Sequence, residues 1–169
     1  MSPELRVPRD VLEESGDELA WKVIAPAYDH VNIYEGAREL AETLAPLTAG
    51  QRALLALHWC VSEVCNGGFD QFFTNPTGIL APEALEGARL IGAGRTAEVI
   101  ARACAVFPGG LPSRDRAERE DFLETLDEDD REEAFGALDE PFYELIDSEL
   151  YPRADAYVRA HPGEFFLPG

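Results

Sequence analysis

The stretch TAGQRALLALHWCVSEVCN, residues 48–66, carries the strongest helix pattern in the chain. Thr48 is followed three residues later by Gln51, which is the spacing of a capping box at a helix N-terminus. Apolar residues at three- and four-residue spacing then form one face, and two further apolar side chains add a second face. A helix that is apolar over most of its circumference usually lies at the centre of a bundle. The stretch therefore predicts a central helix that ends at Gly67 and Gly68.

Helical spacing continues on both sides of this stretch, and proline and glycine interrupt it. Asn32 is expected to cap the preceding helix, and Pro82 suits the first turn of a following helix. No strand pattern of useful length and no internal repeat is found. We therefore expect an all-α fold, a single-domain bundle of seven or eight helices. Residues 1–16 would form an N-terminal arm or short helix, and residues 17–169 the single helical domain.

The net charge limits the classes of partner. The chain has 169 residues, with 33 acidic and 14 basic side chains, and a formal charge of −19. Neutralising phosphates requires clustered lysine and arginine, so direct binding of nucleic acid or of an anionic membrane surface is disfavoured. No apolar run approaches the roughly 20 residues that span a bilayer, and three cysteines do not form a disulfide framework. A cytoplasmic location is expected.

Most of the negative charge lies in residues 113–149, where 16 acidic residues and four arginines give a net charge of −12. Apolar residues in this region keep helical spacing, which predicts a packed pair of amphipathic helices with an acidic outer face. Five of the acids, from Glu118 to Glu132, recur at three- or four-residue spacing, which predicts one stripe. The residues expected on the partner-binding acidic face are Glu118, Asp121, Glu124, Asp127, Glu128, Asp129, Asp130, Glu132 and Glu133.

Catalytic and metal-binding patterns are weak. The three histidines are spread along the chain, and His58, Cys60, Glu63 and Cys65, which lie within eight residues, are expected on different faces of the helix, so no metal ion is expected. The three cysteines lie in apolar helical runs, where cysteine behaves as a small hydrophobe. We therefore expect neither a cofactor nor catalytic residues, and the chain is not predicted to be an enzyme.

The segment EVCNGGFDQFFTN, residues 63–75, stands out from its surroundings. Adjacent glycines allow positive φ and close approach of the backbone, and the amide side chains can satisfy backbone groups without carrying charge. Two interpretations stay open. One is a structural corner held by amide hydrogen bonds, and the other is a small-molecule-binding or enzymatic pocket with a carboxylate as general base. The candidate binding residues are Glu63, Asn66, Gly67, Gly68, Phe69, Gln71, Phe72 and Asn75.

The motif Asn-Gly-Gly-Phe-Asp-Gln-Phe-Phe-x-Asn-x-x-Gly, from Asn66 to Gly78, carries a resemblance. With ARLIGA at 88–93 and LDEPFY at 138–143, it resembles the pattern of a bacterial family of small acidic helical proteins. That family is a domain of unknown function and includes a DNA-mimic protein. The resemblance covers residues 19–166, implies an all-α fold, and supplies no catalytic residues.

The resemblance suggests the hypothesis that the protein has an interaction role in which its carboxylates imitate DNA phosphates. Duplex DNA presents one charge per about 1.7 Å of axis, and a helix rises about 1.5 Å per residue, so acids on one face approach phosphate density. The expected partner is a basic protein such as a DNA-binding regulator. A solvated acidic face, or an acidity common to the source proteome, remains the alternative. The aromatic tail at Phe165 and Phe166 is a candidate homodimer interface.

Overall fold

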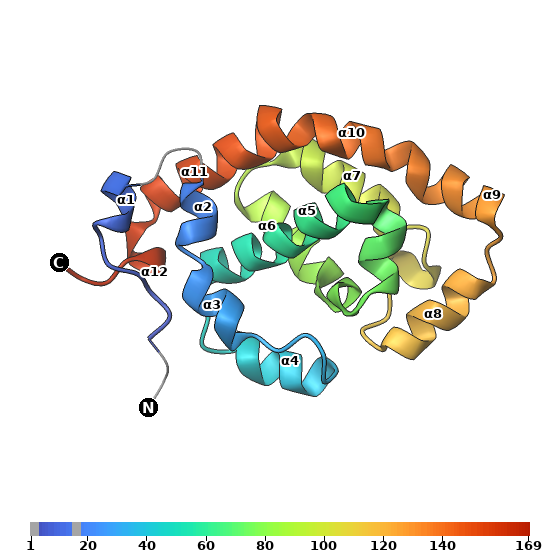
Figure 1. Ribbon diagram of the computed structural model, residues 1–169, viewed down its shortest axis with the longest axis horizontal. Helices are drawn as coiled ribbons and strands as arrows, with labels where there is room; N and C mark the ends of the chain where they lie inside the picture. The colour runs from blue at the N-terminus through green and yellow to red at the C-terminus, as the bar shows by residue number, and fades with distance from the viewer. Residues whose placement is uncertain (1–3, 15–17) are drawn as a thin grey trace.

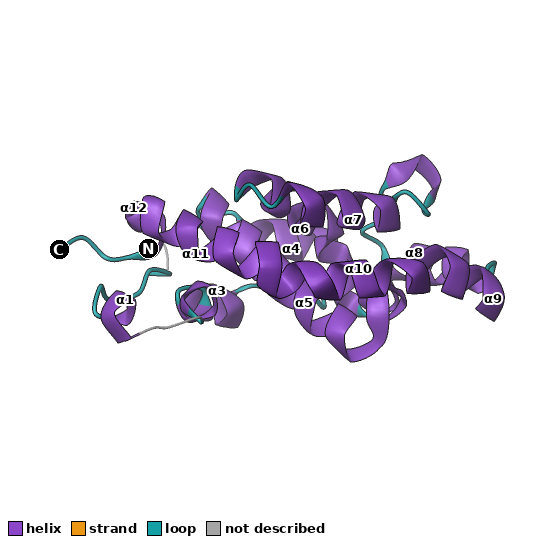
Figure 2. Cartoon of the chain, turned by 90° about the horizontal axis from the view of Figure 1, so that it is seen from above, coloured by secondary structure: helices purple, strands orange, loops and turns teal. Residues whose placement is uncertain are grey.

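The computed structural model describes residues 4–14 and 18–169, which form helices and loops without a strand (Figures 1 and 2). This confirms the expected all-α class. The expected boundary between residues 16 and 17 lies outside the described residues. The helical segments outnumber the seven or eight expected, because several span only four residues and are too short to produce a sequence period. None of these described helices is both long and apolar enough to cross a membrane.

Nine helical elements precede residue 111 in the part of the chain that the structure describes. They are α1 (Val11–Glu14), α2 (Leu19–Lys22), α3 (Ala25–His30), α4 (Ala37–Leu44), α5 (Ala49–Thr74), η1 (Pro76–Leu80), α6 (Ala81–Leu90), α7 (Gly94–Cys104) and η2 (Pro108–Gly110). The remaining elements are α8 (Arg116–Glu124), α9 (Glu128–Arg131), η3 (Glu132–Gly136), α10 (Ala137–Leu145), η4 (Ile146–Leu150), α11 (Tyr151–Ala160) and α12 (Pro162–Phe165).

Helix α5 runs through the centre of the bundle, as its sequence predicts (Figure 1). The capping box is present: the Thr48 hydroxyl accepts from the Gln51 N–H at 3.2 Å, and the Gln51 side chain accepts from the Thr48 N–H at 3.0 Å. Helix α6 packs so closely on α5 that a Cβ on Gly87 would lie 2.8 Å from the Cα of Ala53. The strongest local pattern thus forms the element around which the others pack.

Of the pair of helices expected in residues 113–149, the first is α8, and the second is part of a single long helical run that forms the upper edge of the molecule in Figure 1. Elements α9, η3, α10, η4 and α11 follow one another without a loop from Glu128 to Ala160. η3 and η4 are π-helical turns. η3 ends five residues before Pro141, and η4 ends two residues before Pro152. Proline removes a helical N–H, and these wider turns accompany the prolines without ending the run.

The two ends of the chain pair with each other at one end of the molecule, and α8 and α9 lie at the opposite end (Figures 1 and 2). The Val7 N–H donates to the Phe165 carbonyl at 2.9 Å, and the Leu167 N–H donates back to the Val7 carbonyl at 2.9 Å. Phe165 and Phe166 are buried within the chain. The expectation that these rings cover a dimer interface is therefore wrong, because they already pack in the core.

The start of α4 differs from the expectation. Gly36, with φ 92°, occupies the N-cap position, and no side chain caps the helix. The Asn32 side chain instead accepts from the Tyr34 N–H at 2.9 Å, in the turn before the helix. Asn32 thus stabilises the turn that leads into α4, since asparagine suits such turns as well as caps. Pro82 does lie in the first turn of α6, as predicted.

A buried arginine joins α8 to the end of α5. The Arg119 side chain is 1% exposed, and its guanidinium donates to the carbonyls of Phe73 at 3.1 Å, Asn75 at 3.1 Å and Ser113 at 2.9 Å. The last carbonyls of a helix have no partner within the helix, and their dipoles favour a cation. Burial lowers the pKa of Arg119, although an arginine in a protein stays protonated. Arg119 therefore satisfies the C-terminal end of α5 from inside the protein.

A carboxylate of the long helix caps α7. The backbone N–H and the hydroxyl of Thr96 both donate to Glu149 at 2.7 Å, and the Arg95 N–H donates to it at 3.3 Å. Burial alone would raise the pKa of Glu149, but the hydrogen bonds from Thr96 and Arg95 outweigh this effect and lower it. Ionised Glu149 therefore stabilises the folded state.

Glu149→Gln is expected to lower the free energy of unfolding by about 1–2 kcal/mol at neutral pH, because a charge-assisted cap becomes a neutral one. The pKa of Glu149 is lower in the folded state, so its contribution is complete above about pH 4.5 and is lost as the pH falls through the folded value. Urea unfolding at pH 7 and near pH 3 measures both effects. Asp147→Asn, on the exposed side of η4, serves as the control. A deficit that is equally large near pH 3 would contradict the assignment.

Candidate functional site

The two glycines of the motif interrupt α5. Gly67 has φ −158° and ψ 22°, and Gly68 has φ 76° and ψ −179°, so helical geometry stops there and resumes at Phe69. The Phe69 N–H, freed by the interruption, donates to Asp139 of α10 at 2.9 Å. A Cβ on Gly68 would collide with the carboxylate of Asp139. The predicted break is confirmed, and the structure adds its partner, because Asp139 caps the second part of α5.

The environment of Asp139 is acidic. Burial raises its pKa, the hydrogen bond from Phe69 opposes this, and the charges of Glu132 and Asp70 raise it further. The charges that raise the pKa of Asp139 are thus those of two other carboxylates. Asp139 consequently belongs to the same acidic surface as the predicted partner-binding residues.

The polar residues of the motif surround one carboxylate. Glu63, which is half-buried, accepts at its Oε2 atom from the Gln71 amide at 2.7 Å and from the Asn75 amide at 3.0 Å. Asn66 is exposed. An open hollow of about 600 Å³ is lined by Ser62, Glu63, Cys65, Asn66, Gln71 and Asn75. The motif therefore forms both a corner held by amide hydrogen bonds and a polar hollow.

The remaining motif residues are structural. Phe69 and Phe72 are fully buried. The Phe69 ring packs edge-on against the Phe142 ring, with the two ring centroids 5.2 Å apart. Burial, followed by the charge of Asp147, raises the pKa of the Cys65 thiol, which keeps it protonated and a poor nucleophile. Among the residues that the structure describes, no three His, Cys, Asp or Glu side chains are arranged to hold a metal ion.

A second hollow joins the motif to the acidic region. It has a volume of about 490 Å³ and lies where the interruption of α5 meets α9 and α10. Arg131 bridges the two parts, since its guanidinium contacts Asp70 at 3.1 Å and donates to the Leu123 carbonyl at 2.6 Å. The acidic side chains in its lining are Asp70, Glu124, Glu128, Glu132 and Asp139. Motif and acidic region, which are far apart in the sequence, thus meet on one surface.

All nine residues predicted for the acidic face are exposed. Within the described chain, none of the nine forms an ion pair. The four arginines of the region have other contacts: Arg114 pairs with Glu83, Arg116 with Glu120, Arg131 with Asp70, and Arg119 is buried against carbonyls. None of these four arginines therefore pairs directly with an acid of this face.

The single stripe expected from Glu118 to Glu132 is not formed. Helix α8 ends at Glu124, and α9 begins after Asp127, whose side chain accepts from the Asp130 N–H at 2.8 Å. The two helices meet at an angle at the end of the molecule (Figure 1). The acids are thus divided between two helices, because the intervening residues form a capped turn.

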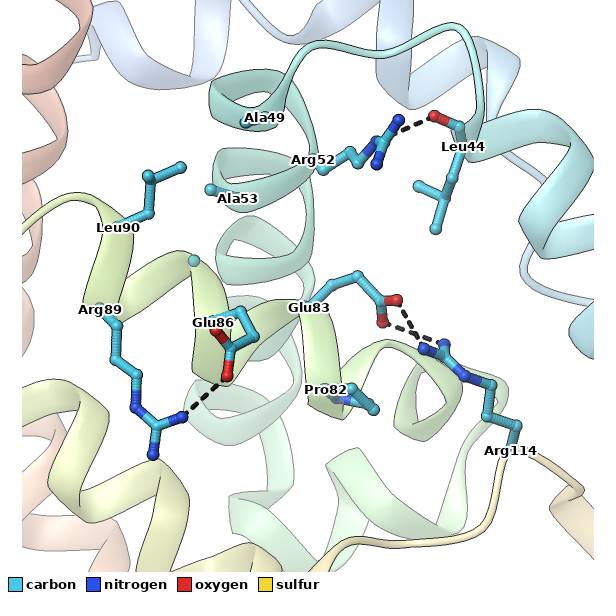
Figure 3. A pocket seen from close by; sticks show the side chains of 11 residues that line it. Leu44, Ala49, Arg52, Ala53, Pro82, Glu83, Glu86, Arg89, Leu90 and Arg114 are labelled. Carbon is cyan, nitrogen blue, oxygen red and sulfur yellow. Dashed lines mark hydrogen bonds and ion pairs between the residues drawn. The ribbon is translucent and has the colours of Figure 1, made fainter.

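A further groove lies elsewhere, between α4, α5 and α6, and no sequence motif pointed to it (Figure 3). Its volume is about 690 Å³. Each charged side chain of its lining has a partner: Arg114 binds Glu83 at 2.7 Å, Arg89 binds Glu86 at 2.8 Å, and Arg52 donates to the Leu44 carbonyl at 3.1 Å. The Arg52 contact joins α5 to α4 and the Arg114 contact joins α6 to the segment before α8, while the Arg89–Glu86 pair lies within α6.

The functional contacts that sequence reasoning missed join distant segments. Asp139 and Arg131 lie 70 and 61 residues from their motif partners. Asp139 does lie within the LDEPFY segment that carries part of the family resemblance. No pattern of neighbouring residues, however, predicts that it accepts a hydrogen bond from the Phe69 N–H. Only the folded chain brings these residues together.

Comparison with known proteins places these features in a family. The family described as DMP19-like protein matches residues 45–161, which include α5, the motif, the acidic region and all of α11. No curated protein and no solved structure matches the chain. The matched segment is more than half of the chain and contains both hollows and the acidic face. The chain therefore belongs to the DMP19-like protein family.

Proposed function

We propose that the protein is an interaction module that imitates the charge of DNA and occupies the DNA-binding surface of a basic protein. Its role on this proposal is binding and not catalysis, and the expected partner is a DNA-binding regulator. The observation that carries the proposal is the group of nine exposed acids on α8, the capped turn at Asp127, α9 and η3, none of which forms an ion pair with a described residue. Uncompensated charge of one sign accelerates association with an oppositely charged surface.

Two further observations support this role. The acids lie on helices that also pack apolar side chains, such as the buried Leu123 and Phe135, so their positions are held by the core. A preorganised array loses less conformational entropy on binding than a flexible acidic tail. Membership of the DMP19-like family is consistent with the proposal, since the sequence resembles a family that includes a DNA-mimic protein.

The proposal is tested by neutralising four exposed acids whose side chains form no hydrogen bond with the residues that the structure describes. We expect the quadruple variant to bind its partner about thirtyfold more weakly, at about 0.5 kcal/mol for each exposed charge. The immobilised protein captures partners from its source cell at low salt, and the recovered protein is expected to bind duplex DNA and to be released by it. The substitutions are Asp121→Asn, Glu128→Gln, Asp129→Asn and Glu133→Gln.

A matched control removes the same number of charges elsewhere and is expected to bind within about twofold of the wild type. The control substitutions, also at exposed positions, are Asp10→Asn, Glu13→Gln, Glu35→Gln and Glu98→Gln. Equal loss of binding in both variants would show that only net charge matters. Recovery that neither salt nor duplex DNA affects would contradict mimicry.

A further inference from the structure

The hollow at Glu63 presents hydrogen-bond acceptors and no cation. Both amide donors reach the Oε2 atom of Glu63, and no described residue pairs with its Oε1 atom. Gln71 and Asn75 turn their NH₂ groups toward this carboxylate, so their carbonyl oxygens remain acceptors. No lysine, arginine or histidine is among the residues that line the hollow. A ligand that fits this hollow therefore donates several hydrogen bonds and carries positive charge.

An aromatic surface lies beside the hollow. Trp59 is one helical turn before Glu63 on α5, so the two side chains project from the same face. The Tyr28 ring stacks on Trp59 with centroids 5.0 Å apart and is itself 39% exposed. Tyrosine and tryptophan are enriched at the hot spots of protein interfaces, and their rings attract cations.

We propose that this hollow binds a guanidinium group, supplied by an arginine side chain of a protein partner. A planar guanidinium has five donors and no acceptor, which matches a carboxylate flanked by amide oxygens. It is also more weakly hydrated than the ammonium of lysine and stacks on aromatic rings. The side chain enters the hollow, and the flanking residues of the partner lie against Tyr28 and Trp59.

An arginine from a protein suits the site better than free arginine. The hollow is open to solvent, and an adjoining aromatic surface extends the contact beyond one side chain. Free arginine, in contrast, carries no flanking residues that could extend onto this surface. The inference rests on the proposed function for the source of the arginine, a basic partner, but it uses none of the nine acids of the acidic face.

The test uses the full chain and the blocked peptide acetyl-Gly-Arg-Gly-amide, followed by NMR of the side-chain NH₂ groups of Gln71, Asn75 and Asn66. We expect these signals to shift with a Kd of a few millimolar, and the lysine peptide and free arginine to bind at least threefold more weakly. Glu63→Gln should weaken the arginine peptide at least tenfold, while Glu98→Gln, which removes the same charge at an exposed site, leaves it unchanged.

The outcomes separate the two proposals. In the quadruple variant of the acidic face, the peptide still binds at the Glu63 hollow if the inference holds, even though capture of the partner is lost. Circular dichroism establishes that Glu63→Gln is folded, and Asn66→Ala, at an exposed position, is expected to weaken the peptide about threefold. The inference is overturned if the three NH₂ signals do not shift, if the lysine peptide or free arginine binds as tightly, or if folded Glu63→Gln binds like the wild type.

Discussion

Replacing Arg119 with methionine is expected to lower the free energy of unfolding by about 3–5 kcal/mol. The arginine is 1% exposed, and its guanidinium satisfies carbonyls at the end of α5 and in the segment before α8. Methionine fills much of the volume but donates no hydrogen bond, so several buried carbonyls lose their partner. Urea unfolding followed by circular dichroism measures the change. Arg119→Lys keeps the charge but lacks the planar guanidinium. Its free energy of unfolding is expected to lie between those of the wild type and Arg119→Met.

Arg116→Met is the matched control, because Arg116 lies on the same helix and donates to the Thr74 carbonyl at 3.2 Å. Its side chain is 50% exposed and pairs with Glu120 at 3.0 Å. Water replaces these contacts when the side chain is removed, so a loss of at most about 1 kcal/mol is expected. If both variants lose similar stability, the contribution of Arg119 does not arise from satisfying buried carbonyls.

Local signals made much of the fold predictable. The Thr48–Gln51 capping box, the apolar circumference of α5 and the Gly67–Gly68 interruption each depend on residues close in sequence, and all three are present. The exposure of the acids was predictable for the same reason, because an amphipathic helix separates its polar and apolar positions by spacing alone. What these signals share is that the interacting residues are neighbours along the chain.

The unexpected contacts arise from tertiary packing. Arg119 binds carbonyls of Phe73 and Asn75, and nothing in the sequence around a surface-like arginine on an acidic helix indicates that it is buried. Likewise, the charge and the motif occupy separate segments, yet Arg131 and Asp70 join them in space. Such pairings depend on how helices pack, which a one-dimensional period does not encode.

The sequence does contain a signal for the break between α8 and α9, but the regular spacing of the acidic residues predicted no break. Asp127 precedes three acidic residues, and an aspartate followed by acids is typical of an N-cap and first turn. The three- and four-residue spacing continues across the turn, so it suggested one uninterrupted stripe. The capping signal at Asp127 outweighs the periodic one, since a capped turn changes the direction of the chain.

Gly68→Ala is expected to lower the free energy of unfolding by about 2–5 kcal/mol, from two separable causes. The backbone at Gly68, with φ 76° and ψ −179°, is a conformation that residues with a Cβ adopt only at a cost of about 1–3 kcal/mol. The added Cβ would also displace the carboxylate of Asp139 from the Phe69 N–H, which removes the cap of the second part of α5. Gly94→Ala is the control, since a Cβ there meets nothing within 4 Å and is expected to be neutral or slightly stabilising.

Backbone strain at Gly68 can be separated from displacement of the Asp139 carboxylate in a variant that lacks this carboxylate. Asp139→Ala alone removes the cap and is expected to cost about 1–2 kcal/mol. In that background the collision is absent, so Gly68→Ala should cost only the backbone strain, and the two substitutions together should cost less than the sum of their separate effects. Urea unfolding of the four proteins of this cycle gives the coupling directly. Strict additivity would mean that Asp139 does not require the glycine, and the close approach between the motif and α10 would then have no energetic role.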